Sequence, residues 1–223
     1  MASHTARIGA VAGWITLVGI LGYHLLLQAL AGTRVSGTTD QSLIAAYYGT
    51  GTVAWLGIEQ MFVTVPFTIV AAALWEVLSQ QDEARLWAAV AFAAAIIEAA
   101  LIVIAASLQA ALVAGAAAGL DLVVVFRLWD VLYNTGVYIV EMTMTVAFGL
   151  AFLRSGLFPR WLAGLSFLVA AGLLVASTAI WVGLPDPATL PVNLGFAVWF
   201  AGVSLALGGL ASRPVTVTAM GTT

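Results

Sequence analysis

The sequence contains no cysteine and no lysine, and only 8% of its 223 residues are charged. The absence of cysteine excludes disulfide bonds, iron–sulfur clusters held by thiolates and thiol nucleophiles. The seven basic residues are all arginines, and they are scattered, so no basic run indicates binding to nucleic acid. Soluble domains usually have about a quarter of their residues charged. The composition therefore excludes an ordinary soluble domain as the bulk of this chain.

Apolar residues make up 63% of the chain, and its mean hydropathy is +1.10. A helix needs about 20 apolar residues to cross about 30 Å of hydrocarbon. Six runs are long enough, at residues 8–31, 52–77, 86–110, 125–153, 160–183 and 190–211. We predict an all-α integral membrane bundle of six transmembrane helices. Residues 1–211 would form this single domain, and residues 212–223 would be a disordered tail.

The first run has features of a secretory signal peptide, because Arg7 precedes it and small residues follow at "ALAG", residues 29–32. The apolar stretch from Ile8 to Gln28 is longer than the roughly 7–15 residues typical of a signal peptide. We therefore expect this run to be the first membrane span.

The arginines predict the orientation of the bundle. With six spans, both termini lie on one side, together with five arginines: Arg7, Arg85, Arg154, Arg160 and Arg213. The other side would hold only Arg34 and Arg127. Short loops rich in arginine remain in the cytoplasm. We expect an N-in, C-in protein of a bacterial plasma membrane.

The connections between the spans carry recognisable local signals. Asp40 can cap a short helix that runs to Tyr48, because its carboxylate accepts hydrogen bonds from first-turn amides. Tyr47 and Tyr48 are expected at the membrane interface, where amphipathic rings prefer to lie. An alanine- and glycine-rich connection is expected at about residues 111–124. Pro159 is placed to begin the fifth span.

The fourth span contains an unusual polar stretch, "FRLWDVLYNTGVYIVEMTMT", from Phe126 to Thr145. At 100° per residue, six of its side chains fall within about 80° of one another: Arg127, Asp130, Asn134, Tyr138, Glu141 and Thr145. A charged side chain at the centre of a bilayer costs at least about 2.5–3.5 kcal/mol. We therefore expect this stripe to face the interior of the bundle.

The first three spans carry matching polar and aromatic residues: His24 and Gln28, then Trp55, Glu59 and Gln60, then Glu98 and Gln109. A rise of 1.5 Å per residue puts Glu98 and Glu141 near the middle of the membrane and Glu59 in its outer half. Spans five and six have almost no polar groups in their cores. The pattern predicts an outward-facing polar pocket built by spans one to four.

Glu59, Glu98 and Glu141 are the candidate catalytic residues, because three carboxyls in a low-dielectric bundle favour protonation of at least one of them. Ten residues are candidates for substrate binding: His24, Gln28, Trp55, Gln60, Arg127, Trp129, Asp130, Tyr133, Asn134 and Tyr138. Simpler explanations stay open. Arg127 can pair with Asp130 or Asp121, and His24 can serve merely to bond Gln28 or a neighbouring carbonyl. No His-x-x-x-His or Glu-x-x-His pair exists, so we expect neither a metal site nor a cofactor.

Two segments resemble the DUF4386 family of bacterial multi-pass membrane proteins. They are "TARIGAVAGWITLVGI" (Thr5–Ile20) and "YNTGVYIVEMTMTVAFGLAFLRSGLFPRWLAGL" (Tyr133–Leu165). The second is similar to that family's polar fourth helix and its following "KSG-hydrophobic-FPR" turn, here Arg154–Arg160. The third span departs from the family, since Glu98 stands where an arginine or another polar residue is expected. The resemblance implies six spans. The function of the family is unknown, so no catalytic residue is carried over.

Three classes of function fit these observations. The first is an intramembrane acid–base enzyme that cyclises or isomerises an isoprenoid or other lipid-like substrate. The second is binding or proton-coupled transport of a small amphipathic molecule, since intramembrane acids also form proton relays. The third is a structural or partner subunit. We expect contacts with membrane lipids and with a small hydrophobic or amphipathic ligand. Glycines near spans five and six leave a homodimer open.

Overall fold

The computed structural model describes residues 2–31, 35, 37–181 and 189–212. Within its helices, the side chains of residues 2–3, 23–29, 31, 54–56, 58–59, 61, 179–181, 189–190 and 193 lie outside this description. The described part is helical, without strands. Residues 213–223 of the predicted tail lie outside it.

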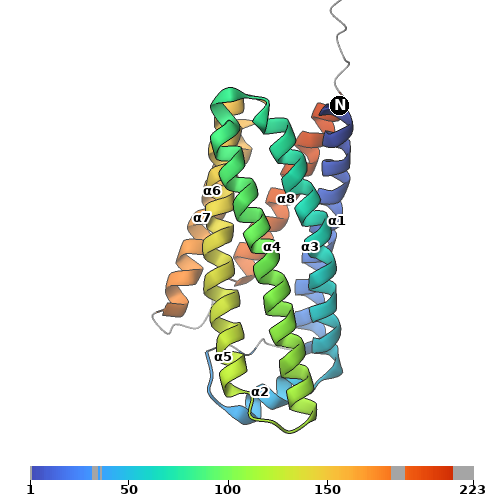
Figure 1. Cartoon of the computed structure of the whole chain (residues 1–223), viewed down its shortest axis with the longest axis vertical. Helices are drawn as coiled ribbons and strands as arrows, with labels where there is room; N and C mark the ends of the chain where they lie inside the picture. Colours follow the sequence, from blue (N-terminus) through green and yellow to red (C-terminus); the bar gives the residue numbers. More distant parts are fainter. Residues whose placement is uncertain (1, 32–34, 36, 182–188, 213–223) are drawn as a thin grey trace, which may run out of the picture.

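Six membrane-length helices run along the described part of the chain (Figure 1). They are α1 (Ala2–Ala31), α3 (Gly51–Ser79), α4 (Asp82–Ala117), the continuous helix α5–η1–α6 (Val123–Ser155), α7 (Arg160–Trp181) and α8 (Thr189–Ala211). The predicted six-span, all-α fold is confirmed. The chain is a multi-pass integral membrane protein.

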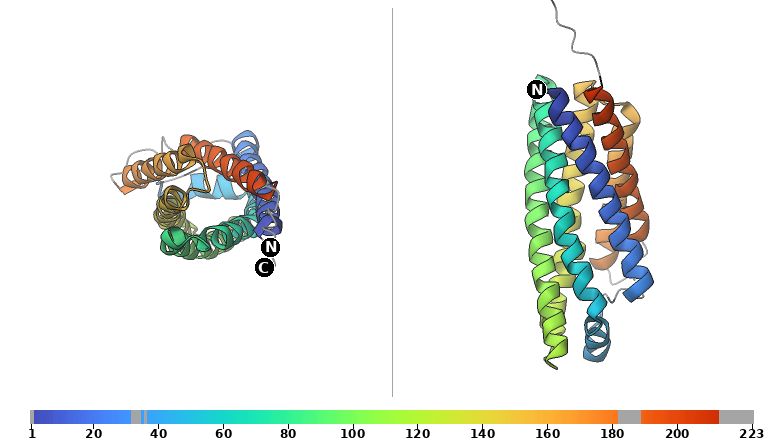
Figure 2. Two further views of the ribbon diagram at one scale, coloured as in Figure 1. Left: turned by 90° about the horizontal axis from the view of Figure 1, so that it is seen from above. Right: turned by 90° about the vertical axis from the view of Figure 1, so that its right-hand side faces the viewer.

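The helices form a closed ring when the bundle is seen along its axis (Figure 2). α1 packs against α3 and α8, α4 lies between α3 and α6, and α7 joins α6 to α8. Alanine allows the close approach on α4, where Ala84, Ala88, Ala91 and Ala95 are fully buried. Large side chains face outward, and Phe62 is 73% exposed. The ring therefore presents an apolar outer surface to lipid and encloses its polar groups.

A short helix, α2 (Gln41–Tyr48), lies across one end of the ring (Figure 1). Its predicted cap is confirmed: Asp40 Oδ1 accepts hydrogen bonds from the Ser42 amide (2.8 Å) and the Ser42 hydroxyl (2.6 Å). These bonds lower the pKa of Asp40. Tyr47 and Tyr48 are 8% and 0% exposed. The structure thus packs both rings against the end of the bundle, and their expected position at the membrane interface stays a prediction.

Two connections can be compared with their predictions. α4 continues to Ala117, so the expected connection at 111–124 shrinks to residues 118–122. Alanine is the best helix former, and the helix ends only at the turn where Gly119 adopts a positive φ of 69°. α7 begins at Arg160, directly after Pro159 as predicted.

The native absence of cysteine allows a direct test of orientation. Thr39 and Gln80 are both exposed, and they lie at opposite ends of the bundle. In intact cells, a membrane-impermeant maleimide should label Thr39→Cys but not Gln80→Cys, because the arginine distribution places Gln80 inside. Gln80→Cys should react once the membrane is permeabilised. The reverse labelling pattern would show the opposite orientation.

Candidate functional site

The ring encloses a cavity of about 80 Å³. Twelve residues line it: Thr16 and Ile20 of α1, Gln60, Val63, Thr64 and Phe67 of α3, Glu98 and Ile102 of α4, Tyr133 and Glu141 of η1–α6, and Phe196 and Phe200 of α8. All polar lining groups come from the first four spans. The cavity is smaller than the engineered cavity of about 150 Å³ that holds one benzene. It has room for a few water molecules or for one end of a larger molecule.

Two carboxyl groups meet at this cavity. Glu98 lies near the middle of α4 and is 4% exposed, and Glu141 is half-buried on α6, the helix that packs against α4. A side-chain hydrogen bond joins the two residues. Two carboxyls can share a hydrogen bond only when one of them carries the proton. With one proton between them, the two carboxyls can act as a proton donor and a proton acceptor.

Glu98 has no second hydrogen-bonding support from the part of the chain that the structure describes. Its Oε2 atom is buried and accepts no hydrogen bond from any described protein group. A buried carboxyl oxygen without a donor is costly, by about 1–3 kcal/mol for an unsatisfied polar group. Such unsatisfied groups call for a specific explanation. Here the explanation is the adjacent cavity, which can bring water or a ligand to this oxygen.

The remaining polar lining is mostly satisfied by the protein. Gln60 Nε2 donates to the Tyr133 hydroxyl over 3.2 Å. Thr16 and Thr64 donate their hydroxyl protons to backbone carbonyls of their own helices, at 2.9 Å and 3.1 Å. Their oxygen atoms keep free lone pairs and can accept but not donate. The cavity thus offers several acceptors beside the carboxyl pair.

Aromatic rings form another part of the wall, and they differ from those predicted. Phe67 and Phe200 lie in edge-to-face contact with centroids 6.1 Å apart, and Phe196 lies beside Phe200. Of the predicted aromatic residues with described side chains, only Tyr133 lines the cavity. The contribution of span six was missed, because Phe196 and Phe200 are ordinary apolar positions and nothing in their spacing marks them.

Trp129 and Tyr138 are buried elsewhere. Trp129 stacks on Tyr133 with centroids 5.6 Å apart and contacts the edge of Tyr48. Tyr138 is 4% exposed and belongs to the apolar core. Both residues were candidates for substrate binding, and neither lines the cavity. Trp129 instead joins α2 to the bundle through Tyr48, and its stacking on Tyr133 helps to hold that ring in place.

The fourth span is not a continuous α-helix, because residues Leu132–Val137 form a π-helical segment, η1. A π turn holds an extra residue, so side chains beyond it are rotated about the axis relative to a regular α-helix. The residues of the predicted stripe face inward except Arg127, which lies before this segment. Asp130, Asn134 and Tyr138 are buried, Glu141 reaches the cavity, and Arg127 is exposed.

Asp130 and Asn134 fasten a loop and do not line the cavity. Asn134 Nδ2 donates to Asp130 Oδ1 over 2.6 Å, and the Gly37 amide donates to Asp130 Oδ2 over 3.0 Å. Gln41 adds two bonds, to the Leu120 carbonyl and the Leu122 amide. Together these bonds fix α2 across the end of the ring.

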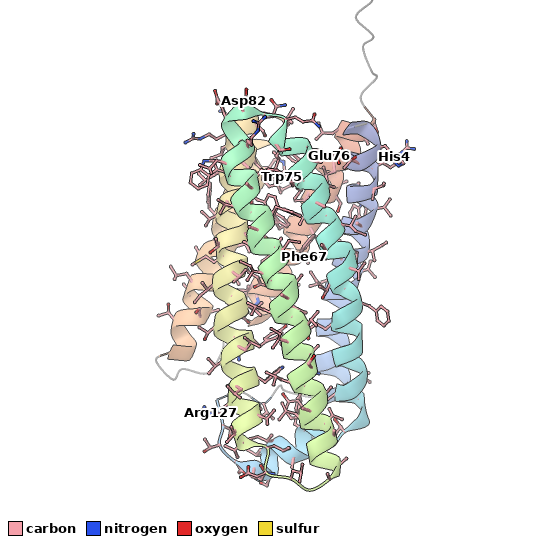
Figure 3. All side chains as sticks on the ribbon, viewed as in Figure 1. His4, Phe67, Trp75, Glu76, Asp82 and Arg127 are labelled. Carbon is pink, nitrogen blue, oxygen red and sulfur yellow. The ribbon has the colours of Figure 1, made fainter. Side chains whose placement is uncertain are left out.

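Arg127 lies at the edge of the bundle, near the end that carries α2 (Figure 3). The ion pair expected with Asp130 or Asp121 is absent, since the only ion pair among the described residues joins Arg85 to Asp82 at 3.3 Å. Arg127 instead borders an apolar outer groove with Val124 and Leu128. Arg127 therefore does not belong to the candidate site.

Four candidate residues have side chains outside the described residues: His24, Gln28, Trp55 and Glu59. Their helices, α1 and α3, both line the cavity. Among the residues that the structure describes, no three of His, Asp and Glu come together in a way that could hold a metal ion. Gln109 is 3% exposed and donates to the Val53 carbonyl over 2.9 Å, which is a structural bond between α4 and α3.

Comparisons with known proteins found no match: no model of a protein family, no curated protein and no solved structure matches this chain. The resemblance to the DUF4386 family therefore stays a prediction. Any function of the candidate site is therefore inferred from its geometry.

Unfolding temperatures can show whether the Glu98 carboxyl holds the fold together or is present for another reason. Replacing both members of a buried polar pair by apolar side chains of similar size is often neutral or stabilising, whereas removing one member leaves the other unpaired. We expect the double variant Glu98→Leu/Glu141→Leu to unfold, in detergent, at or above the temperature of the wild type. Gln109→Leu is the matched control on the same helix as Glu98, and loss of its hydrogen bond should cost about 1 kcal/mol. A large destabilisation by the double variant would identify the pair as a structural group.

Proposed function

We propose that this membrane protein is an intramembrane acid–base enzyme, of the isomerase or cyclase type, that acts on an isoprenoid or other lipid-like substrate. The observation that carries the proposal is the hydrogen-bonded pair Glu98–Glu141 at the wall of an internal cavity. A donor and an acceptor side by side can give a proton to a substrate and take one back in the same turnover.

The chemistry can be written without any cofactor. The protonated carboxyl of the pair gives its proton to one carbon of a substrate double bond, which leaves a carbocation at the other carbon. The partner carboxylate removes a proton from a neighbouring carbon, and a new double bond forms. In a cyclisation, a second double bond attacks the cation before this proton is lost. The pair holds one proton before and after the turnover, so the balance closes.

The aromatic wall supports a cationic intermediate. The faces of aromatic rings attract cations through their quadrupoles, and the attraction reaches about 2 kcal/mol or more where water is excluded. Phe67, Phe196 and Phe200 line the cavity. None of the described lining residues carries a positive charge. Gln60 and Tyr133 offer a polar contact that can orient the reacting end of the substrate. A hydrocarbon chain would extend from the cavity toward the bilayer, because about 80 Å³ holds only one end of it.

The small volume of the cavity also favours a second candidate function, proton-coupled binding or transport. A cavity of about 80 Å³ suits water or a small polar molecule. Protonation of the Glu98–Glu141 pair would then change the affinity for that molecule, as intramembrane acids do in transporters. This alternative uses the carboxyls but makes no use of the phenylalanine wall, and it predicts no new chemical product.

The first test compares lipid-soluble extracts from cells with the wild type, with Glu141→Gln, with Glu98→Gln and without the gene. We expect one compound to appear only with the wild type and its precursor to accumulate with both variants, because glutamine cannot supply a carboxylic proton. Glu76→Gln is the matched control, since Glu76 lies at the end of the bundle and accepts a bond from Thr5 at 3.0 Å. It should behave as the wild type.

An unaltered molecule that changes compartment, without a new compound, would favour transport. Extracts that do not differ among folded variants would contradict both candidate functions.

A second test separates the cationic mechanism from simple binding. Phe200→Leu keeps an apolar wall but removes a ring face, so product formation should slow by about tenfold. Phe152→Leu is the matched control, because Phe152 is buried in the core and does not line the cavity. Rates are measured on the precursor identified by the first test. Equal rates for the two variants would show that no cation forms beside Phe200.

A further inference from the structure

A second hollow lies on the outside of the ring, between α1 and α8, near Arg7 and Ser212. Figure 2 shows the start of α1 beside the end of α8. The volume of the hollow is about 490 Å³. Ten residues line it: Arg7, Ala10, Val11 and Trp14 of α1, and Ser204, Leu205, Gly208, Gly209, Ala211 and Ser212 at the end of α8. We call it the α1–α8 groove. It is separate from the internal cavity and shares no lining residue with it.

Small residues create the groove. The two helices touch at Gly13, where an added Cβ would collide with the Ser204 side chain. Nearer the end, a Cβ on Gly208 or Gly209 would meet no atom within 4 Å. The helices therefore leave an open channel whose floor lacks side chains. A channel of this shape on a lipid-facing surface can take a hydrocarbon chain lying along the helices.

The described lining of the groove includes hydrogen-bond donors and no acid. Ser204 and Ser212 donate their hydroxyl protons to carbonyls of their own helix, at 2.7 Å and 3.0 Å. Arg7 and Trp14 are thus the lining residues whose side chains still offer hydrogen-bond donors. They are seven residues apart on one face of α1, which separates them by about 10 Å along the axis. Arginine recognises phosphate, and tryptophan prefers the headgroup level of the membrane.

We propose that the α1–α8 groove binds a phospholipid with an anionic headgroup. Its phosphate would bind Arg7, its glycerol region would lie over Gly208 and Gly209 at about the same depth, and one acyl chain would continue deeper past Trp14. Charge argues against a second copy of the chain in the same groove. Two copies that span one membrane in the same direction would bring their Arg7 side chains together, and no described lining residue is acidic. This site stands whether or not the proposed function holds.

The test measures the thermal unfolding of the purified full chain in neutral detergent during titration with phosphatidylglycerol. The unfolding temperature should rise to saturation, since a ligand that binds the folded state stabilises it. Phosphatidylcholine should give a smaller shift at equal concentration. For Arg7→Gln, half-saturation should need about five- to tenfold more phosphatidylglycerol. Arg85→Gln should titrate like the wild type. Arg85 has the same charge at the same end of the bundle, but it pairs with Asp82 outside the groove.

Gly208→Leu tests the groove with Arg7 intact, because leucine fits the open space beside Arg7 and fills the place of the glycerol region. It should weaken binding of phosphatidylglycerol without lowering the stability of the lipid-free protein. Equal shifts with phosphatidylcholine, or an equal loss in Arg85→Gln, would overturn the proposal. An equal shift with glycerol phosphate would reduce the site to a bare phosphate site. Dimers that Gly208→Leu dissociates, without any lipid dependence, would assign the groove to a second copy.

Discussion

The structure depends on one constraint, which is that hydrocarbon offers no hydrogen bonds and almost no stabilisation of charge. Every backbone amide in the membrane must be satisfied within its own segment, so long helices form the described part of the spans. Polar side chains must then either bond locally or turn inward. Most threonine and serine hydroxyls in these helices donate to a carbonyl of the preceding turn. Glu98 and Glu141 have no such local solution, and they turn to each other across the α4–α6 contact.

Packing of small residues decides where the interior is closed and where it is hollow. Alanines of α4 bring this helix close to its neighbours at one end of the bundle, and large aromatic residues fill the ring beside it. Trp199 is a central filler, since its Nε1 donates to Ser166 over 2.8 Å and its ring packs on Phe148. The cavity lies where Thr16, Thr64 and Gln60 face the interior instead of large aromatic side chains. Gly13 allows close approach between α1 and α8, whereas Gly208 and Gly209 leave open space at the groove.

The end of the bundle that carries α2 is closed by polar bonds as well as by aromatic packing. Asp130 holds the loop before α2 through the Gly37 amide, and Gln41 holds the turn after α4. Ile44 and Tyr48 of α2 are fully buried. Tyr133 takes part in both regions, because it stacks on Trp129 and also lines the cavity. The aromatic contacts that close this end of the bundle therefore also hold Tyr133 at the wall of the cavity.

The number of spans, the helical class and the cap at Asp40 could be predicted from the sequence, because they depend on local composition and on hydrogen bonds between near neighbours. The sequence also indicated that Glu98 and Glu141 face inward, since a carboxyl cannot face lipid cheaply. Three features depended on tertiary structure. The fourth span contains a π-helical segment, Arg127 is exposed at the end of the bundle, and Asp130 anchors the loop before α2. Phe196 and Phe200 joined the site from the last span, and the α1–α8 groove formed where two distant segments diverge. These features arise from the packing of helices far apart in the chain, and no local pattern of residues encodes them.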